Sequence, residues 1–128
     1  MDSTQLKRIP LFSDASDEEL KQVAAFAQSK EVPEGEEILS EGGFSRELLA
    51  IEDGTAEVTR DGEKIADLGP GDVFGEAGML DDSMRSATVT STSRMRLISL
   101  GHFEVKRLKK DAPGVYGSIE KLVEERSE

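Results

Sequence analysis

The sequence contains no cysteine, and it has a single histidine, His102, in 128 residues. Without cysteine the chain has no disulfide framework, no thiolate nucleophile and no zinc–thiolate site. One histidine is too few for the metal enzymes of small barrel shape, which gather several histidines around the ion. His102 follows Gly101 at a predicted helix start, where we expect it at the surface, and no serine lies in a nucleophile elbow. We therefore expect no metal site, no catalytic residue and no enzyme.

Long hydrophobic runs are also missing, since no apolar stretch approaches the roughly 20 residues that a membrane span needs. The first five residues lack the basic and apolar regions of a secretion signal. We therefore expect no membrane association and a cytoplasmic location. Hydrophobic residues make up 36% of the chain and charged residues 34%, a balance that suits one globular domain with a buried core.

Basic residues are few, because 16 lysines and arginines stand against 27 acids and leave a formal net charge of −11. Most of such a surface repels duplex DNA and anionic membranes. The densest basic group, residues 106–110, is interpreted as the solvated end of a helix. No residues remain after the last predicted helix for a helix-turn-helix. The sequence therefore predicts no direct binding of nucleic acid.

Three zones follow one another along a single domain, which we place at residues 1–128. Residues 1–28 are predicted to be helical, and their main helix begins with a capping box in which Ser16 precedes Glu19 by three positions. Four apolar residues then form one helical stripe: Leu20, Val23, Ala24 and Ala27. Residues 29–100 are predicted to be short strands, and residues 101–128 two closing helices.

The central zone is punctuated by turn sequences roughly 8–12 residues apart, a pattern typical of small all-β domains. The pair Asp61-Gly62 lies between two alternating segments and predicts a tight hairpin. We therefore predict a mainly β fold with flanking helices (α+β), built as an antiparallel β-barrel or jelly roll (a double-stranded β-helix).

The closing zone contains a short helix over 103–110 and a longer one over 112–126. Asp111 is predicted to cap the second helix, and Pro113 is tolerated in its first turn. An apolar stripe must be buried against the barrel, a ligand or a second subunit. It consists of Val115, Ile119, Leu122 and Val123, with Tyr116 beside it.

The stretch from Phe74 to Val89 carries the chemistry. Gly75 permits a tight turn or a close approach by a ligand. The next residues are compact enough for one helical turn, whose free N–H groups suit a phosphate. Arg85 brings a forked, permanently charged partner for that phosphate, while Glu76 can accept hydrogen bonds from sugar hydroxyls. Together they indicate a sugar-phosphate ligand, although Arg85 could instead pair with nearby acids such as Asp81.

Phe-Gly-Glu, a short variable loop and then Arg-Ser-Ala-Thr-Val over 74–89 resemble the phosphate-binding cassette of the cyclic-nucleotide-binding family. That family includes the catabolite-activator type and the regulatory domains of cyclic-nucleotide-dependent kinases and channels. The resemblance extends to the opening Leu6–Phe12, to the turn Gly69-Pro70-Gly71-Asp72 and to the two closing helices, which match the family's hinge and lid helices.

The resemblance implies a role for each residue of the cassette. Arg85 would pair with the cyclic phosphate and Glu76 would accept from the ribose 2′-hydroxyl. The pocket would be lined by Phe74, Gly75, Glu76, Ala77, Gly78, Arg85, Ser86 and Ala87. A lid over the base would come from Val115, Tyr116 or Ile119. Ser86 leaves the choice between cAMP and cGMP open, with cAMP preferred.

Three function classes remain from the sequence. The first is a cyclic-nucleotide sensor without a resident cofactor, which signals through its closing helices to a protein partner or a second copy of itself. The second is the same fold with a degenerate pocket, acting as an interaction or dimerisation module. The third, a barrel-fold metal enzyme, is disfavoured by the missing cysteine and the single histidine.

Overall fold

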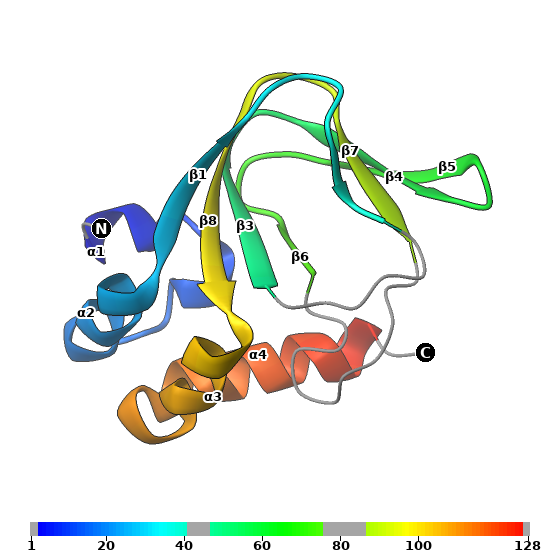
Figure 1. The fold of residues 1–128 in the computed structure, drawn as a ribbon. Coiled ribbons are helices and arrows are strands. Elements are labelled where there is room, and N and C mark those ends of the chain that lie inside the picture. Colours follow the sequence, from blue (N-terminus) through cyan, green and yellow to red (C-terminus); the bar gives the residue numbers. More distant parts are fainter. Residues whose placement is uncertain (1–2, 41–46, 76–86, 127–128) are drawn as a thin grey trace.

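The computed structural model describes residues 3–40, 47–75 and 87–126, and its strands form two four-stranded antiparallel sheets (Figure 1). In spatial order the first sheet contains β1 (Gln28–Val32), β8 (Met95–Gly101), β3 (Glu47–Asp53) and β6 (Val73–Phe74). The second contains β2 (Glu37–Leu39), β7 (Thr88–Ser91), β4 (Ala56–Arg60) and β5 (Glu63–Leu68). Over the described strands the sheets are not closed into a barrel. Of the two predicted β architectures, the jelly roll is therefore the one observed.

The predicted hairpin is confirmed between β4 and β5, where Arg60 pairs with Glu63. Asp61 and Gly62 have φ angles of 53° and 82°, so both central residues are left-handed. Two-residue hairpins favour this geometry because its twist matches that of the flanking strands.

Two hydrophobic clusters hold the sheets and helices together, and strand alternation divides the residues between them. On β3, Leu49 and Ile51 face the second sheet, whereas Leu48 and Ala50 face the helices. The cluster between the sheets also contains Val32, Leu39, Ala56, Phe74, Val89, Met95 and Leu97. The other cluster, which we call the helical cluster, joins the first sheet to the helices at both ends of the chain.

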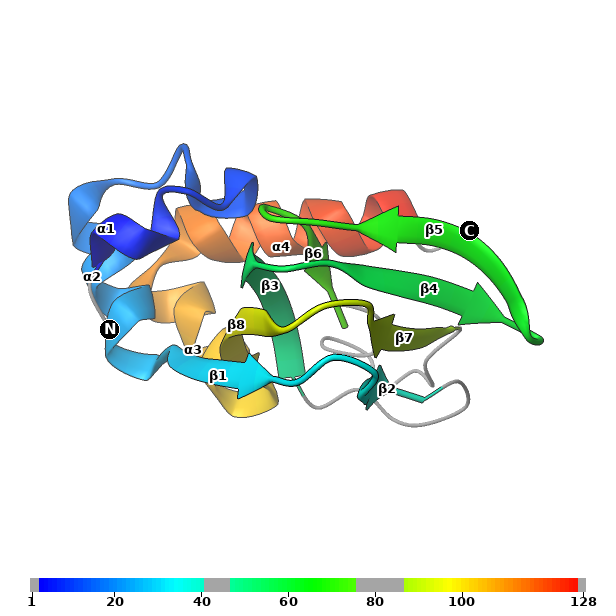
Figure 2. The ribbon, with the colours of Figure 1, turned by 90° about the horizontal axis from the view of Figure 1, so that it is seen from above.

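The β4–β5 hairpin projects at one end of the roll, and most of the helices gather at the other, with the last helix extending from there beneath the strands (Figure 1 and Figure 2). The helices are α1 (Ser3–Leu6), the 3-10 helix η1 (Pro10–Phe12), α2 (Asp17–Phe26), α3 (His102–Asp111) and α4 (Pro113–Arg126). The predicted cap of α2 is confirmed, because Ser16 Oγ accepts from the N–H of Glu19 at 3.2 Å. None of the helices in the described ranges is both long and apolar enough to span a membrane.

Two local expectations for the closing helices were wrong. His102 is buried, with 7% of its surface exposed, whereas the next residue, Phe103, is 74% exposed. His102 is the first residue of α3, and its side chain faces the interior. The side chain of the next residue, Phe103, therefore faces solvent. Asp111 is the last residue of α3, and the first free amides of α4 donate to Glu19 instead.

Candidate functional site

The predicted cassette connects the two sheets, because it leaves β6 of the first sheet and enters β7 of the second. Phe74 is buried between the sheets and Ala87 is half-buried just before β7. The other predicted cassette residues lie outside the described residues; they are Glu76, Ala77, Gly78, Arg85 and Ser86. The described structure therefore defines how the cassette begins and ends.

Gly75, at the start of the cassette, occupies a position that only glycine fits. Its φ of +80° lies in the left-handed region, which side chains disfavour. A Cβ atom there would lie 2.6 Å from the carbonyl oxygen of Glu47 and 3.7 Å from Leu39 Cδ1. Pairing of Phe74 with Leu49 brings the chain this close to β3. Of the two roles predicted for Gly75, the structure shows the backbone turn, with β3 packed closely against it, and a close approach by a ligand stays a prediction.

A recess of about 180 Å³ opens beside this turn, between the two sheets. Leu39 and Glu47, the two residues that a Cβ atom at Gly75 would approach, both line this recess. Its apolar lining continues with Val32, Ile38, Leu49 and Leu97, and its charged lining is Lys30, Glu36 and Glu47. A hollow lined by both apolar and charged side chains suits a small ligand that has an apolar and a polar end.

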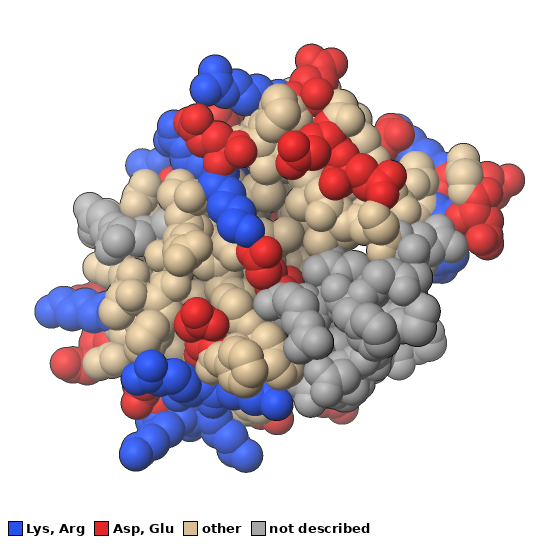
Figure 3. All heavy atoms as spheres, viewed as in Figure 1, with Lys and Arg blue, Asp and Glu red and all other residues tan. Residues whose placement is uncertain are grey.

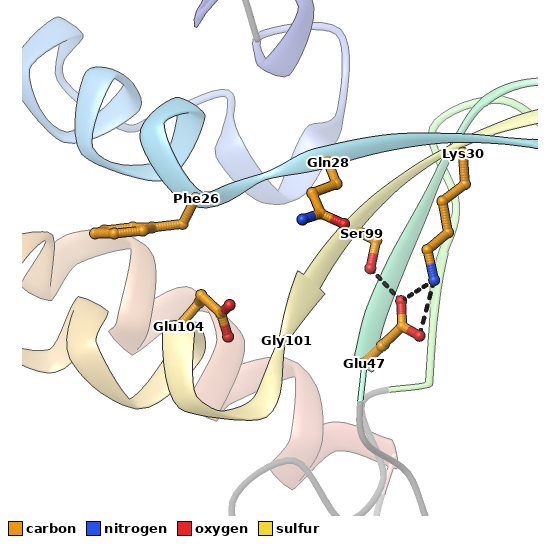
Figure 4. A pocket seen from close by; sticks show the side chains of 7 residues that line it. All are labelled: Phe26, Gln28, Lys30, Glu47, Ser99, Gly101 and Glu104. Atoms are coloured by element: carbon orange, nitrogen blue, oxygen red, sulfur yellow. Dashed lines mark hydrogen bonds and ion pairs between the residues drawn. The ribbon is translucent and has the colours of Figure 1, made fainter.

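Glu47 is the centre of a polar network at the edge of this recess (Figure 4). Lys30 Nζ donates to both carboxylate oxygens of Glu47, at 2.9 and 2.6 Å, and Ser99 Oγ donates to Oε2. The network also borders a second hollow of about 150 Å³, whose far wall is formed by Phe26 and Glu104. Among the described residues that line either hollow, Lys30 is the only cation, and Glu47 neutralises it.

Sequence reasoning missed the network of Lys30, Glu47 and Ser99. The signal was present in the strand alternation, since each residue lies two positions from a buried apolar residue of the inter-sheet cluster. Three polar side chains on inward positions of β1, β3 and β8 must find one another or water. Recognising that they meet requires the strand order β1-β8-β3, which no local pattern contains.

The predicted lid residues lie on α4, on the side that packs against the other helices. Val115 and Ile119 are 1% and 0% exposed, and both belong to the helical cluster. Tyr116 is half-buried and packs against the same cluster. A contact between these residues and a nucleotide base stays a prediction.

Farther along α4, Leu122 faces a hollow that it shares with the strand leading into the cassette. Leu122 and Val73 line a common hollow of about 220 Å³ together with Pro10, Leu11, Gly71 and Asp72. Val73 is the first residue of β6 and immediately precedes Phe74. Asp72, just before it, is tied to β3 because its carbonyl accepts from the N–H of Ile51 at 2.8 Å. The end of the last helix and the strand that leads into the cassette thus face a common hollow, and Leu122 packs against the helical cluster to which Val73 belongs.

The surface is mixed in charge around these features. On the face of Figure 3, acidic side chains spread over the upper part, and basic ones gather along the lower edge, where α3 lies in Figure 1. Within the described ranges, no group of three or more histidine, aspartate or glutamate residues is placed to hold a metal ion.

Comparison with known sequences gives a family that is consistent with the observed jelly roll, its helices and the glycine turn at the start of the cassette. The chain matches the family described as "Cyclic nucleotide-binding domain" over residues 29–111, and it belongs to that family. It is 36% identical over 105 residues to a cAMP-dependent protein kinase regulatory subunit of Yarrowia lipolytica. That match covers 80% of this chain but only 28% of the relative, so the chain spans less than a third of that protein.

Solved structures show the same fold. The catabolite activator protein of Thermus thermophilus superposes with a TM-score of 0.83 at 28% identity, covering 92% of this chain and 58% of that one. A structure described as Sp-2Cl-cAMPS bound to PKAR CBD2 gives a TM-score of 0.82 at 26% identity, covering 98% of this chain and 81% of that one.

Proposed function

We propose that this domain is a cAMP sensor that binds the nucleotide in the cassette and transmits occupancy through α4. The observation that carries the proposal is the glycine-only turn at Gly75, which starts a family-matched cassette beside the recess between the sheets. Relatives named as cAMP-dependent regulatory subunits support cAMP as the ligand, with cGMP as the alternative. The proposed role is regulatory rather than enzymatic, located in the cytoplasm, and its output goes to a protein partner or a second copy.

In this proposal Arg85 supplies the charge that holds the cyclic phosphate, together with backbone amides of Glu76, Ala77 and Gly78. In this proposal the positive charge comes from the cassette, since Lys30, the cation lining the described recess, is already paired with Glu47. Glu76 accepts from the ribose hydroxyl, and Phe74, Gly75, Ser86 and Ala87 complete the lining. A forked guanidinium in a site screened from water outweighs the repulsion of a distant net negative charge, which salt weakens.

Transmission in this proposal follows the hollow and the hydrophobic cluster that Leu122 and Val73 share. A ligand that reorganises the cassette displaces Val73 or its neighbours, and the packing of Leu122 then favours a different position of the end of α4. Ligand binding shifts such an equilibrium only by its differential affinity for the two positions. Contacts of the base with Val115, Tyr116 or Ile119 would add to that difference, and because the first and last of these are buried, Tyr116 is the most accessible.

Calorimetric titration with cAMP and with cGMP tests the binding proposal. Saturable binding of one stoichiometric equivalent of cAMP is expected. If neither nucleotide binds at millimolar concentration, the second candidate function, an interaction or dimerisation module with a degenerate pocket, replaces the sensor.

Replacing Ser86 by threonine is expected to lower the ratio of cGMP to cAMP dissociation constants, by at most about tenfold. The added threonine hydroxyl can bond the guanine edge, but the serine already supplies a hydroxyl, which limits the change. Titration of both variants with both nucleotides measures the ratio. An unchanged ratio would place base selection elsewhere, most directly on the last helix.

Saturating cAMP is expected to change amide hydrogen exchange in two separate places, the cassette and α4. Exchange in the cassette reports direct binding, whereas exchange on α4 reports transmission. A response confined to the cassette would mean that the domain binds without switching, and the sensor role would then be abandoned.

A further inference from the structure

The N-terminus of α4 is held by a carboxylate from the other end of the chain. Glu19 Oε2 accepts from the backbone N–H of Gly114 at 2.7 Å and of Val115 at 3.2 Å, across a sequence separation of 95 and 96 residues. Glu19 belongs to the first turn of α2, whose own cap is Ser16. The glutamate of the predicted capping box therefore joins two helices, while its other oxygen, Oε1, accepts from Ser16 Oγ at 3.5 Å within its own helix start.

These two bonds complete the first turn of α4. A helix begins with N–H groups that have no partner inside the helix, and a negative charge there is favourable. Pro113 has no N–H, and the N–H of Tyr116 donates to the carbonyl of Ala112 at 3.0 Å. Gly114 and Val115 are the remaining donors of this turn, and one carboxylate oxygen serves both. Charge-assisted bonds of this type are stronger than neutral ones.

Gly114 leaves room for the Glu19 carboxylate because it has no side chain. A Cβ atom at Gly114 would lie 2.8 Å from Glu19 Oε2 and 2.9 Å from Oε1, too close for the carboxylate to stay in place. Gly117, one turn along the same helix, has open space where its Cβ would lie, with nothing within 4 Å. The two glycines of α4 thus differ in one respect that an experiment can use.

We propose that Glu19 is a positioning residue for α4, a tether that makes the first turn of the helix a fixed pivot. Val115 and Ile119 are buried beside the tether, so the helix is anchored as far as Ile119. Movement is left to the part beyond it, where Leu122 and the strand leading into the cassette line a common hollow. The tether itself is independent of any ligand, whereas the pivot rests on the proposed sensor function.

The tether is tested without nucleotide, by exchange of individual amides. Glu19→Ala is expected to accelerate exchange at Gly114 and Val115 by about tenfold or more, the effect of losing a charge-assisted bond. Glu19→Gln keeps an acceptor oxygen and is expected to restore part of the protection. Glu18→Ala is the control, because Glu18 is an exposed acid in the same first turn of α2. The amide of Ile51, bonded within the roll, should exchange as before in all variants.

A double-mutant cycle tests the same contact from the other side. Alanine is a better helix former than glycine, so Gly117→Ala should slow exchange on α4. Gly114→Ala should do the opposite, because it displaces the carboxylate, and in the Glu19→Ala background it should become protective as well. Equal behaviour of the two glycine variants in wild type, or unchanged exchange of Gly114 and Val115 in Glu19→Ala, overturns the tether.

Adding saturating cAMP separates the pivot from the proposed function. In wild type the cAMP-induced change in exchange is expected beyond Ile119 and not at Gly114 or Val115, whereas in Glu19→Ala it should spread to the start of the helix. A wild-type response of equal size at Gly114 and beyond Ile119, or a response that Glu19→Ala does not spread, refutes the pivot and leaves the sensor function standing. Absence of cAMP binding refutes the sensor function and with it the pivot, while the tether is decided by the ligand-free experiments.

Discussion

Arg85→Ala is expected to abolish measurable cyclic-nucleotide binding while the domain stays folded. Removing one partner of a charge pair that is screened from water costs about 3–5 kcal/mol, which lowers affinity by roughly a hundredfold or more. None of the described residues that line the two hollows beside Glu47 can compensate, because Lys30, the only cation among them, already has Glu47 as its partner. Isothermal titration with cAMP measures the loss, and thermal unfolding followed by circular dichroism checks the fold.

Arg94→Ala provides the control for Arg85→Ala, since it makes the same change in net charge. Arg94 lies between β7 and β8, its side chain is 79% exposed, and it pairs with Glu31 at 3.4 Å. That variant is expected to bind cAMP as wild type does. Near wild-type affinity in Arg85→Ala would refute the assignment of the phosphate site, and equal losses in both variants would assign the effect to net charge.

Gly75→Ala is expected to destabilise the domain by about 2–4 kcal/mol and to weaken nucleotide binding with it. About 1 kcal/mol comes from placing a side chain at a φ of +80°, and about 1–3 kcal/mol comes from steric overlap. The overlap is severe because the Cβ would lie 2.6 Å from a backbone oxygen, that of Glu47, which cannot swing away as a side chain would. Urea unfolding gives the free energy, and cAMP titration gives the affinity.

Gly62→Ala separates the two contributions at Gly75. Gly62 has nearly the same φ, +82°, but nothing within 4 Å of its Cβ position. The loss there should therefore be only about 1 kcal/mol, with no effect on cAMP affinity. Equal losses of stability at the two glycines would contradict the close approach of β6 to β3 at Gly75.

Several features of this fold were predictable because residues close in sequence determine them. Asp61-Gly62 forms the tight hairpin, since both residues tolerate the left-handed conformation that the turn requires. Ser16 caps α2 because its hydroxyl is three residues from the N–H it accepts. Family membership was also predictable, since the Phe-Gly-Glu and Arg-Ser-Ala-Thr-Val segments and the distance between them can be read directly from the sequence.

The geometry of the site was less predictable, because it depends on strand order. The recess beside Gly75 takes its lining from β1, β2, β3 and β8, which come together only once two sheets have formed. The same holds for Glu47, which neutralises Lys30 from a different strand. A sequence pattern shows that an inward position is polar, but it does not show which other inward position it faces.

The sequence by itself determined the main helices, the hairpin, the mainly β class and the family, since each follows from conformational preferences or motifs that are local in the chain. The choice of a jelly roll over a closed barrel came from the strand order. Only the tertiary structure decided that His102 is buried while Phe103 is exposed, because that depends on how α3 meets β8. Only it decided that Glu19, rather than the adjacent Asp111, serves the start of α4. The physical reason is the same in both cases. An unpaired amide needs an acceptor, and a hydrophobic stripe needs a surface that buries it. The packing of distant segments determines which residue supplies the acceptor or the surface.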